Sequence, residues 1–253
     1  LYYENSAVVG ANLSGLTILN EQYGLVTGDG IRRIDLKSLN NVRIKNERLL
    51  CFYNSIIYNG KVLSNDTYKD ESKVKYYDVN ELIAAKEGEA PAVTELDIIQ
   101  KQKINFVLAK DGNVYTLESA DNGCNIVKIK NDFTLEKVFA NFQPAKGPYH
   151  SSPTIGMVAS ETENIIYLVS TDGAIYKYIL GDSDSLKAPF IAAESGVSIT
   201  APLQLNQQSG ELYVTYTEER KDESKIVVYS KDGKVLHTVD CGESVPSQIL
   251  FNN

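Results

Sequence analysis

A pentapeptide, KDESK, occurs twice in the chain of 253 residues, at 69–73 and at 221–225, and an alternating apolar segment follows each copy. Similar segments occur between and before the two copies. Counted from the first apolar residue of each segment, the successive steps are 43, 52, 49 and 51 residues. These first apolar residues are Ile31, Val74, Ile126, Ile175 and Ile226. Self-similarity at a fixed period indicates a repeat architecture, here with units of about fifty residues.

Each repeat contains four short segments in which apolar and polar residues alternate, as they do in strands with one buried face. In the last repeat the segments read APLQLNQ, ELYVTYT, KIVVYS and KVLHTV. The connections carry dipeptides that tolerate a positive φ or bond to their own backbone. These dipeptides are Asn59–Gly60, Asp111–Gly112, Asp172–Gly173 and Asp232–Gly233. With 16 Tyr, one Met and no Trp, the composition favours strands over helices.

A four-stranded unit of this size buries both of its faces only against neighbouring units, and a ring of such units is a β-propeller. We therefore predict an all-β fold in which residues 1–253 form a single β-propeller domain of four-stranded antiparallel blades. Five blades are recognisable, at residues 14–47, 48–94, 95–145, 146–195 and 196–244. A β-solenoid and a β-sandwich are the alternatives, and the four-strand repeat favours neither.

The two termini are expected to close the ring. The tail VPSQILFNN resembles the beginnings of two other repeats, each with a proline just before a strand. We expect residues 1–13 and 245–253 to share a sixth blade, which would remove the open sheet edge left by separate blades. One segment departs from the repeat. DVNELIAAKEGEAPAV, at 78–93, is predicted to be an irregular outer strand and loop that could hold a short helical turn.

The segment SSPTIGMVASETENIIYLVSTDGAIYKY, residues 151–178, resembles the repeat of quinoprotein-like and WD-like β-propellers. In that repeat a Ser-Pro-Thr strand start precedes a Tyr-containing strand, an Asp-Gly turn and a second Tyr-containing strand. Quinone-dependent members carry Trp-rich motifs and adjacent cysteines, and this chain has neither, so the resemblance implies no cofactor. Other members are non-catalytic scaffolds of bacterial envelopes or cell-surface binding modules. The resemblance thus implies an extracytoplasmic location, the periplasm or the cell surface.

Catalytic chemistry has few candidates, because the chain holds only two histidines, His150 and His237. His237 lies in the alternating segment KVLHTV, where we expect a surface side chain. Tyr149 and His150 precede the first strand of a predicted blade, in a loop that in propellers borders the axial opening. We predict that these two residues contact a ligand. The alternative to a binding module is a hydrolase or lyase with an axial active site near His150.

Candidate metal ligands are scarce as well. The loop GDSDS offers Asp182 and Asp184, without the glycine and the distal glutamate of an EF-hand loop. A solvated turn is the simpler interpretation, and we predict no metal site. The three cysteines are isolated, which is typical of small buried side chains rather than of a zinc site. The acidic side chains gather in outer loops, which does not favour the paired axial carboxylates of a glycosidase.

The charge of the chain limits its partners. The formal net charge is −8, and no run of Lys or Arg is dense enough to follow a phosphate backbone, which argues against nucleic acid. No apolar window is long enough for a membrane span.

Because the chain begins in strand-like sequence, a further domain or a targeting signal could precede it. We predict a non-catalytic binding or scaffold β-propeller that recognises a protein, peptide or glycan through the loops of one face.

Overall fold

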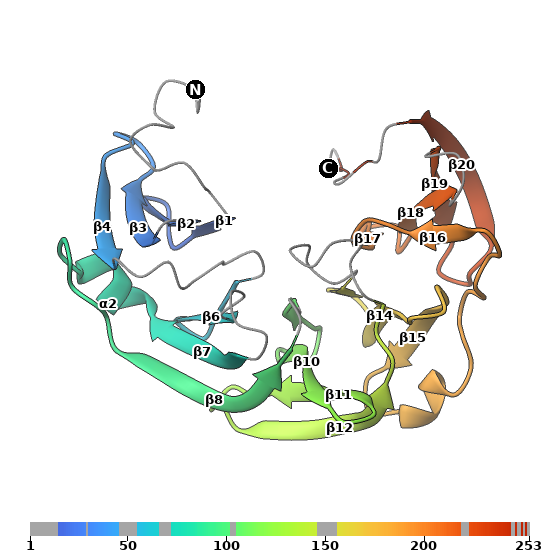
Figure 1. Ribbon diagram of the computed structural model, residues 1–253, viewed down its shortest axis with the longest axis horizontal. Coiled ribbons are helices and arrows are strands. Elements are labelled where there is room, and N and C mark those ends of the chain that lie inside the picture. Colours follow the sequence, from blue (N-terminus) through green and yellow to red (C-terminus); the bar gives the residue numbers. More distant parts are fainter. Residues whose placement is uncertain are drawn as a thin grey trace. The chain divides into compact units, whose positions relative to one another are not determined.

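The computed structural model describes residues 15–28, 30–45, 55–65, 72–101, 105–145, 156–218 and 223–243, together with residues 246, 249 and 251 (Figure 1). These residues form antiparallel sheets joined by turns, with one α-helix and one 3₁₀ helix among them. The chain divides into two compact units, residues 1–103 and residues 104–253. Each unit has its own sheets and its own core.

The first unit contains two four-stranded sheets, and in both the strands lie in sequence order. The first sheet consists of β1 (Gly15–Ile18), β2 (Tyr23–Gly28), β3 (Gly30–Asp35) and β4 (Asn41–Lys45). The second consists of β5 (Ile56–Tyr58), β6 (Lys61–Asn65), β7 (Ser72–Asp78) and β8 (Val93–Gln100). The helix α2 (Val79–Ala84) lies in the connection between β7 and β8.

The core of the first unit brings together side chains from both of its sheets and from α2. Leu25, Ile31 and Ile44 of the first sheet have no exposed surface. Val62 of β6 and Leu82 of α2 belong to the same cluster and are equally buried. Burying an aliphatic side chain of this size contributes about 1.5–3 kcal/mol. Leu82 therefore anchors α2 to the sheets, and the helix is an integral part of this unit.

The helix α2 begins at a well-defined cap, Asp78. Its Oδ1 accepts hydrogen bonds from the backbone N–H groups of Asn80 (2.8 Å) and Glu81 (3.2 Å). Its Oδ2 lies 2.6 Å from Lys61 Nζ. The hydrogen bond from Lys61, followed by those from Glu81 and Asn80, holds the pKa of Asp78 below its usual value. The short helical turn expected in this segment is thus present, and an N-terminal aspartate explains where it starts.

The second unit contains three sheets. The third sheet of the chain consists of β9 (Val107–Leu108), β10 (Val114–Ala120), β11 (Gly123–Ile129) and β12 (Leu135–Phe142). The fourth consists of β13 (Met157–Ala159), β14 (Ile165–Val169) and β15 (Ile175–Ile179), and the 3₁₀ helix η1 (Ser183–Leu186) follows it. The fifth consists of β16 (Val197–Ile199), β17 (Gln204–Leu205), β18 (Leu212–Glu218), β19 (Ser224–Tyr229) and β20 (Val235–Gly242). Both β16 and β17 pair with β18.

The fourth sheet is covered on both faces, and the sequence of β14 reflects this. All five residues of this strand, IIYLV, are buried. Tyr167 and Val169 belong to the core shared with the fifth sheet, while Ile166 and Leu168 belong to the core shared with the third. A strand that is buried on both faces carries a continuous apolar run instead of an alternation.

Two side-chain amides join neighbouring sheets of the second unit. Asn105, just before β9, donates from Nδ2 to the carbonyl oxygen of Met157 (2.7 Å) and accepts from the Met157 N–H (3.0 Å). A Cβ on the preceding residue, Gly156, would collide with the Asn105 side chain. Gln207 donates in a similar way to the Ala159 carbonyl oxygen (3.0 Å). Each amide thus forms hydrogen bonds with backbone groups of β13 that a neighbouring strand would otherwise form.

The predicted turn residues adopt the left-handed conformations that their turns require. Asn59 and Gly60, with φ of 47° and 72°, connect β5 to β6 in a two-residue loop. A type I′ turn needs a positive φ at both of these positions. Gly233, with φ of 78°, lies in the five-residue connection between β19 and β20, where its N–H donates to the Ser230 carbonyl oxygen at 2.9 Å. The dipeptides identified in the sequence therefore set the geometry of these hairpins.

The prediction of an all-β fold built from four-stranded antiparallel sheets is confirmed. The five segments that defined the repeat are the third strands of their sheets, counted in the fifth sheet along the paired order β16-β18-β19-β20. Three details differ from expectation. The fifth sheet has five strands, because both β16 and β17 pair with β18. The strand β8 continues to Gln100, beyond the boundary predicted at residue 94, because Leu96 and Ile98 are buried. Among the described residues the fourth sheet has three strands, and Ile191 forms an isolated bridge with Ile175 beside it.

The described residues of the C-terminal tail contact the fifth sheet. The backbone N–H of Ile249 donates to Gln204 Oε1 at 2.8 Å. The rings of Phe251 and Tyr213 meet edge to face, with centroids 5.0 Å apart. Most residues of the sixth blade expected from the two termini lie outside the described part of the chain, so this blade stays a prediction.

Candidate functional site

Of the residues that the sequence singled out, Tyr149 and His150 lie outside the described residues, and their contact with a ligand stays a prediction. Asp182 and Asp184 are described, and both are engaged within the chain. Asp182 caps η1 by accepting from the Asp184 N–H (3.0 Å), and Asp184 pairs with Lys187 at 2.8 Å. Within the described ranges, no group of three or more His, Cys, Asp and Glu is arranged to hold a metal ion.

The second histidine and Cys124 match the expectation from the sequence, whereas Cys241, on β20, is only partly buried and does not. His237 is exposed on β20, as expected for a surface position. Cys124 is buried in the core of the second unit, and burial raises the pKa of its thiol to about 11. A protonated, buried thiol packs as a small apolar side chain, as the sequence context of Cys124 indicates.

A carboxylate and a phenol of the third sheet whose pKa values are shifted belong to one structural network. Asp111 Oδ2 accepts from Tyr115 Oη (2.9 Å) and pairs with Lys128 Nζ (2.8 Å). Burial, the largest single influence, would raise the pKa of Asp111, but the hydrogen bonds from Lys128, Tyr115 and Asn113 outweigh it and lower that pKa. Burial and the hydrogen bond to Asp111 raise the pKa of Tyr115. Both groups therefore keep their ordinary charge at neutral pH and hold the turn in place.

A pair of buried tyrosines serves a similar purpose in the fifth sheet. The hydroxyl groups of Tyr216 and Tyr229 lie 3.0 Å apart, and both side chains are buried. Burial, and then the hydrogen bond with Tyr229, raises the pKa of Tyr216. Two neutral phenols that satisfy one another stabilise the sheet and offer no charged group to a substrate.

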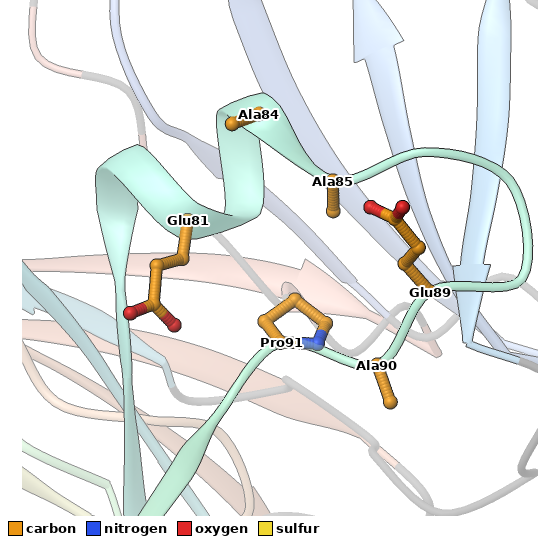
Figure 2. Close-up of a pocket in the computed structure, with 6 residues that line it drawn as sticks. All are labelled: Glu81, Ala84, Ala85, Glu89, Ala90 and Pro91. Carbon is orange, nitrogen blue, oxygen red and sulfur yellow. The ribbon is translucent and has the colours of Figure 1, made fainter.

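A hollow of about 400 Å³ lies beside α2, in the connection between β7 and β8 (Figure 2). We call it the α2 pocket. Its apolar lining comes from small side chains, and two carboxylates flank it: the residues are Ala84, Ala85, Ala90, Pro91, Glu81 and Glu89. In Figure 2 the carboxylates of Glu81 and Glu89 lie on either side of Pro91. The pocket thus combines a narrow apolar surface with negative charge.

The two carboxylates of the α2 pocket are available to a ligand to different degrees. Both side chains belong to exposed residues. Glu89 Oε2 accepts from the backbone N–H of Lys86 at 2.7 Å, which holds its side chain in place and leaves the second oxygen open. Within the described part of the chain, the Glu81 carboxylate has no hydrogen-bond or ion-pair partner. Both groups can therefore accept from a cation that enters the pocket.

A second hollow, of about 510 Å³, lies in the second unit, and we call it the lysine groove. It is formed by connections of three successive sheets and by strand β15 of the fourth sheet. Lys110 comes from the connection between β9 and β10, and residues 162–165 come from the end of the connection between β13 and β14 and the start of β14. The remaining lining residues are Lys177, Ile179, Lys231 and Asp232. Three lysines that are far apart in the sequence thus border one hollow.

Both hollows lie at the same kind of sheet end. In an antiparallel sheet, the connection between the first and second strands shares one end with the connection between the third and fourth. The α2 pocket belongs to the third connection of the second sheet, and the lysine groove to first or third connections of the other unit's sheets. The irregular segment 78–93 is visible in the sequence, but the groove is not predicted there. The Lys-Asp-Gly turns at Lys110 and Lys231 are the sequence feature that could have indicated it.

Comparison with solved structures identifies the fold as a β-propeller. The chain matches TolB from Acinetobacter baumannii with a TM-score of 0.56 and 10% identity, over 92% of this chain and 55% of that one. It matches the Cps50 (Swd1) β-propeller domain of Myceliophteria thermophila with a TM-score of 0.53 and 9% identity, over 93% and 75%. It matches a puromycin hydrolase with a TM-score of 0.59 and 12% identity, over 93% and 38%. At these identities the likeness concerns the fold alone.

The chain spans 55% of the length of the TolB structure, so it corresponds to part of that protein. No curated protein matches the chain in sequence. In the described residues there is no helix with the length and apolar character needed to cross a membrane. A family model described as a domain of unknown function (DUF5074) matches residues 5–252. Because this match takes in almost every residue, the chain belongs to the DUF5074 family.

Proposed function

We propose that this β-propeller is a non-catalytic binding module that recognises a protein or peptide partner through the loops at one end of its sheets. The observation that carries the proposal is the α2 pocket, in which a narrow apolar surface lies between two carboxylates. The pocket is formed by the segment that departs from the four-strand repeat. Loops held by a rigid scaffold are the usual place for recognition residues.

The lining of the α2 pocket suits the side chain of a lysine or an arginine. Such a side chain has an apolar stem that favours apolar surface and a charged end that needs an acceptor. Ala90 and Pro91 would contact the stem, and Glu81 and Glu89 would accept from the charged end. A basic side chain of a partner protein therefore satisfies both parts of the lining at once, whereas a neutral sugar would leave the carboxylates without a counter-charge.

The position of the pocket also favours binding over catalysis. The helix that carries Glu81 is fixed by the buried Leu82 and the Asp78 cap. The loop that carries Glu89 is held by the hydrogen bond from the Gly88 N–H to the Arg43 carbonyl oxygen (2.9 Å), so both sides of the pocket are in place before a ligand arrives. A preformed surface limits the entropy lost on binding. Its two carboxylates belong to exposed residues and face solvent. This arrangement supports an ion-pair contact with a partner.

A selection of random peptides displayed on phage tests the proposal. Peptides enriched on the wild-type chain are expected to carry Lys or Arg, and their affinity should fall about tenfold for Glu81→Gln combined with Glu89→Gln, because charge-assisted hydrogen bonds are lost. Glu87→Gln is the matched control, since Glu87 is an exposed glutamate of the same loop that does not line the pocket. Enriched peptides without basic residues, or peptides that tolerate the double substitution, would contradict the proposal.

The proposal includes a location outside the cytoplasm and a quinoprotein-like or WD-like relationship. Both rest on the Ser-Pro-Thr start, Tyr-containing strands and Asp-Gly turn of residues 151–178. Fractionation of the source cells, with antibody detection of the full gene product, checks the location. Recovery of the protein in the cytoplasmic fraction alone would contradict it.

A further inference from the structure

The lysine groove brings together three lysines that have no ion-pair partner among the described residues. Eight other lysines form ion pairs with carboxylates, at N–O distances of 2.6–3.6 Å. Lys110, Lys177 and Lys231 form none with any described residue. Lys37, Lys86 and Lys234 also form no ion pair with a described residue, so the groove is distinguished by the gathering of three such lysines at one hollow.

One of the three lysines is held in position by its neighbours. Lys177 Nζ donates to the carbonyl oxygen of Lys231 at 3.2 Å, and it lies 5.1 Å from the centroid of the Phe190 ring. Neither contact neutralises the ammonium charge. Lys110 and Lys231 are exposed and stand on turns of other sheets. The groove therefore has one ammonium group held in position and two on exposed turns, and all three can pair with an anionic ligand.

The groove also contains groups of the opposite charge and of neutral polarity. Glu163 and Asp232 are among its lining residues, together with Asn164 and Thr162. Ile179, which is 43% exposed, adds an apolar patch. A ligand that carries negative charge alone, such as a polyphosphate chain, would meet the two carboxylates unfavourably. A suitable ligand carries anionic groups and hydrogen-bond donors side by side.

We propose that the lysine groove binds an acidic peptide segment of a partner protein. Asp and Glu side chains of the segment pair with Lys110, Lys177 and Lys231. Backbone N–H groups of the same segment donate to Glu163 and Asp232, and an apolar side chain covers Ile179. An extended peptide supplies all three kinds of contact within a few residues, which matches the mixed lining of the groove.

This inference goes beyond the proposed function, because it concerns a different hollow, in the other unit of the chain, with a ligand of opposite charge. Loss of basic-peptide binding at the α2 pocket would leave it untouched. If the acidic peptide did not bind at the lysine groove, the proposed binding of basic side chains at the α2 pocket would likewise be unaffected. The two are separated by using variants of one hollow as controls for the other.

Fluorescence anisotropy with a labelled hexaglutamate peptide and the full chain tests the inference. We expect saturable binding that weakens as sodium chloride rises from about 50 to about 200 mM, since the Debye length shortens over that range. Lys110→Glu combined with Lys231→Glu should weaken binding about tenfold, because two exposed ion pairs become repulsive contacts. Lys37→Glu combined with Lys86→Glu is the control that matches the change in charge: both are exposed lysines of the first unit that do not line the groove, and this variant is expected to leave the affinity unchanged.

Three results would overturn the inference. Equal weakening by the groove variant and by the control at Lys37 and Lys86 would show that the peptide responds to overall charge. Equal affinity for a labelled hexaserine peptide would show that the carboxylates are not recognised. Full displacement of the peptide by an equal concentration of inorganic phosphate would assign the groove to a small oxyanion. Lys110→Ala combined with Lys231→Ala, checked for an unchanged circular dichroism spectrum, supplies a second variant that should weaken binding in the same direction.

Discussion

Burial should decide how much the ion pairs of the third sheet contribute to stability, and two pairs of nearly equal length allow a direct comparison. Lys128 and Asp111 are 2.8 Å apart, with side chains 21% and 25% exposed. Lys130 and Glu136 are 2.9 Å apart, with side chains 45% and 48% exposed. Replacing each carboxylate by its amide, with Asp111→Asn and Glu136→Gln, removes one charge and almost no volume.

The structure indicates a large effect for the first substitution and a small one for the second. In Asp111→Asn the amide can keep the hydrogen bond from the Asn113 N–H (3.1 Å), but Lys128 loses its counter-charge and Tyr115 loses its acceptor. One charge-assisted hydrogen bond contributes about 1.5–3 kcal/mol, so we expect a loss of about 2–3 kcal/mol. Exposed ion pairs contribute about 0–1 kcal/mol, so Glu136→Gln should cost about 0.5 kcal/mol or less.

Urea unfolding followed by far-ultraviolet circular dichroism measures both losses. Because the chain contains no Trp, tyrosine fluorescence provides an independent signal for the same transitions. The wild-type chain and both variants are compared at pH 7 and equal salt. Equal losses for the two variants, or a loss below about 0.5 kcal/mol for Asp111→Asn, would refute the reasoning that burial sets the strength of these pairs.

Three further outcomes are expected. The pKa of Asp111 is lower in the folded chain than in the unfolded chain, where it is about 3.9. The stability that its carboxylate contributes is therefore complete above about pH 3.9 and is lost as the pH falls through the folded pKa. In urea unfolding between about pH 6 and pH 2, the stability difference between the wild type and Asp111→Asn should disappear at the acidic end. Asn105→Ala leaves the N–H and the carbonyl group of Met157 without their partner, and unfolding curves should show a loss of about 2–4 kcal/mol, with faster hydrogen exchange at the Met157 amide. Tyr216→Phe and Tyr229→Phe should each lower the free energy of unfolding by about 1–2 kcal/mol, because each single change leaves one buried hydroxyl group without its partner. The double variant should lose less than the sum of the two. Additive losses in a double-mutant cycle would contradict the hydrogen bond between the two hydroxyl groups.

The strands could be predicted because their signals are local. The alternation in residues 123–129 gives β11, and the dipeptide at Asn59 gives the turn before β6. Both depend on residues within a few positions of one another. The end of β8 could not be placed in the same way, because Leu96 and Ile98 also fit the start of the next repeat. Only the pairing of this segment with β7 assigns it to the second sheet.

The two hollows depended on information that no local pattern contains. Lys110, Lys177 and Lys231 belong to three different sheets, and their proximity follows from the stacking of those sheets. The lack of an ion-pair partner is a property of the folded surface as well, since every one of these lysines has acidic residues nearby in the sequence. The α2 pocket was closer to prediction, because the segment 78–93 was visibly irregular, although its sequence did not show that Ala90 would approach the helix.

The pair of hydrogen bonds between the Asn105 amide and the Met157 backbone has a consequence for the evolution of this family. Asn105 fits against the backbone of Met157 only because Gly156 has no side chain there. A methyl group at position 156 would displace the amide, and a shorter side chain at position 105 would remove the need for glycine. The two positions are 51 residues apart in the sequence, yet they are expected to change together among related chains. Covariation of this single pair would therefore mark which family members share the same junction between their third and fourth sheets.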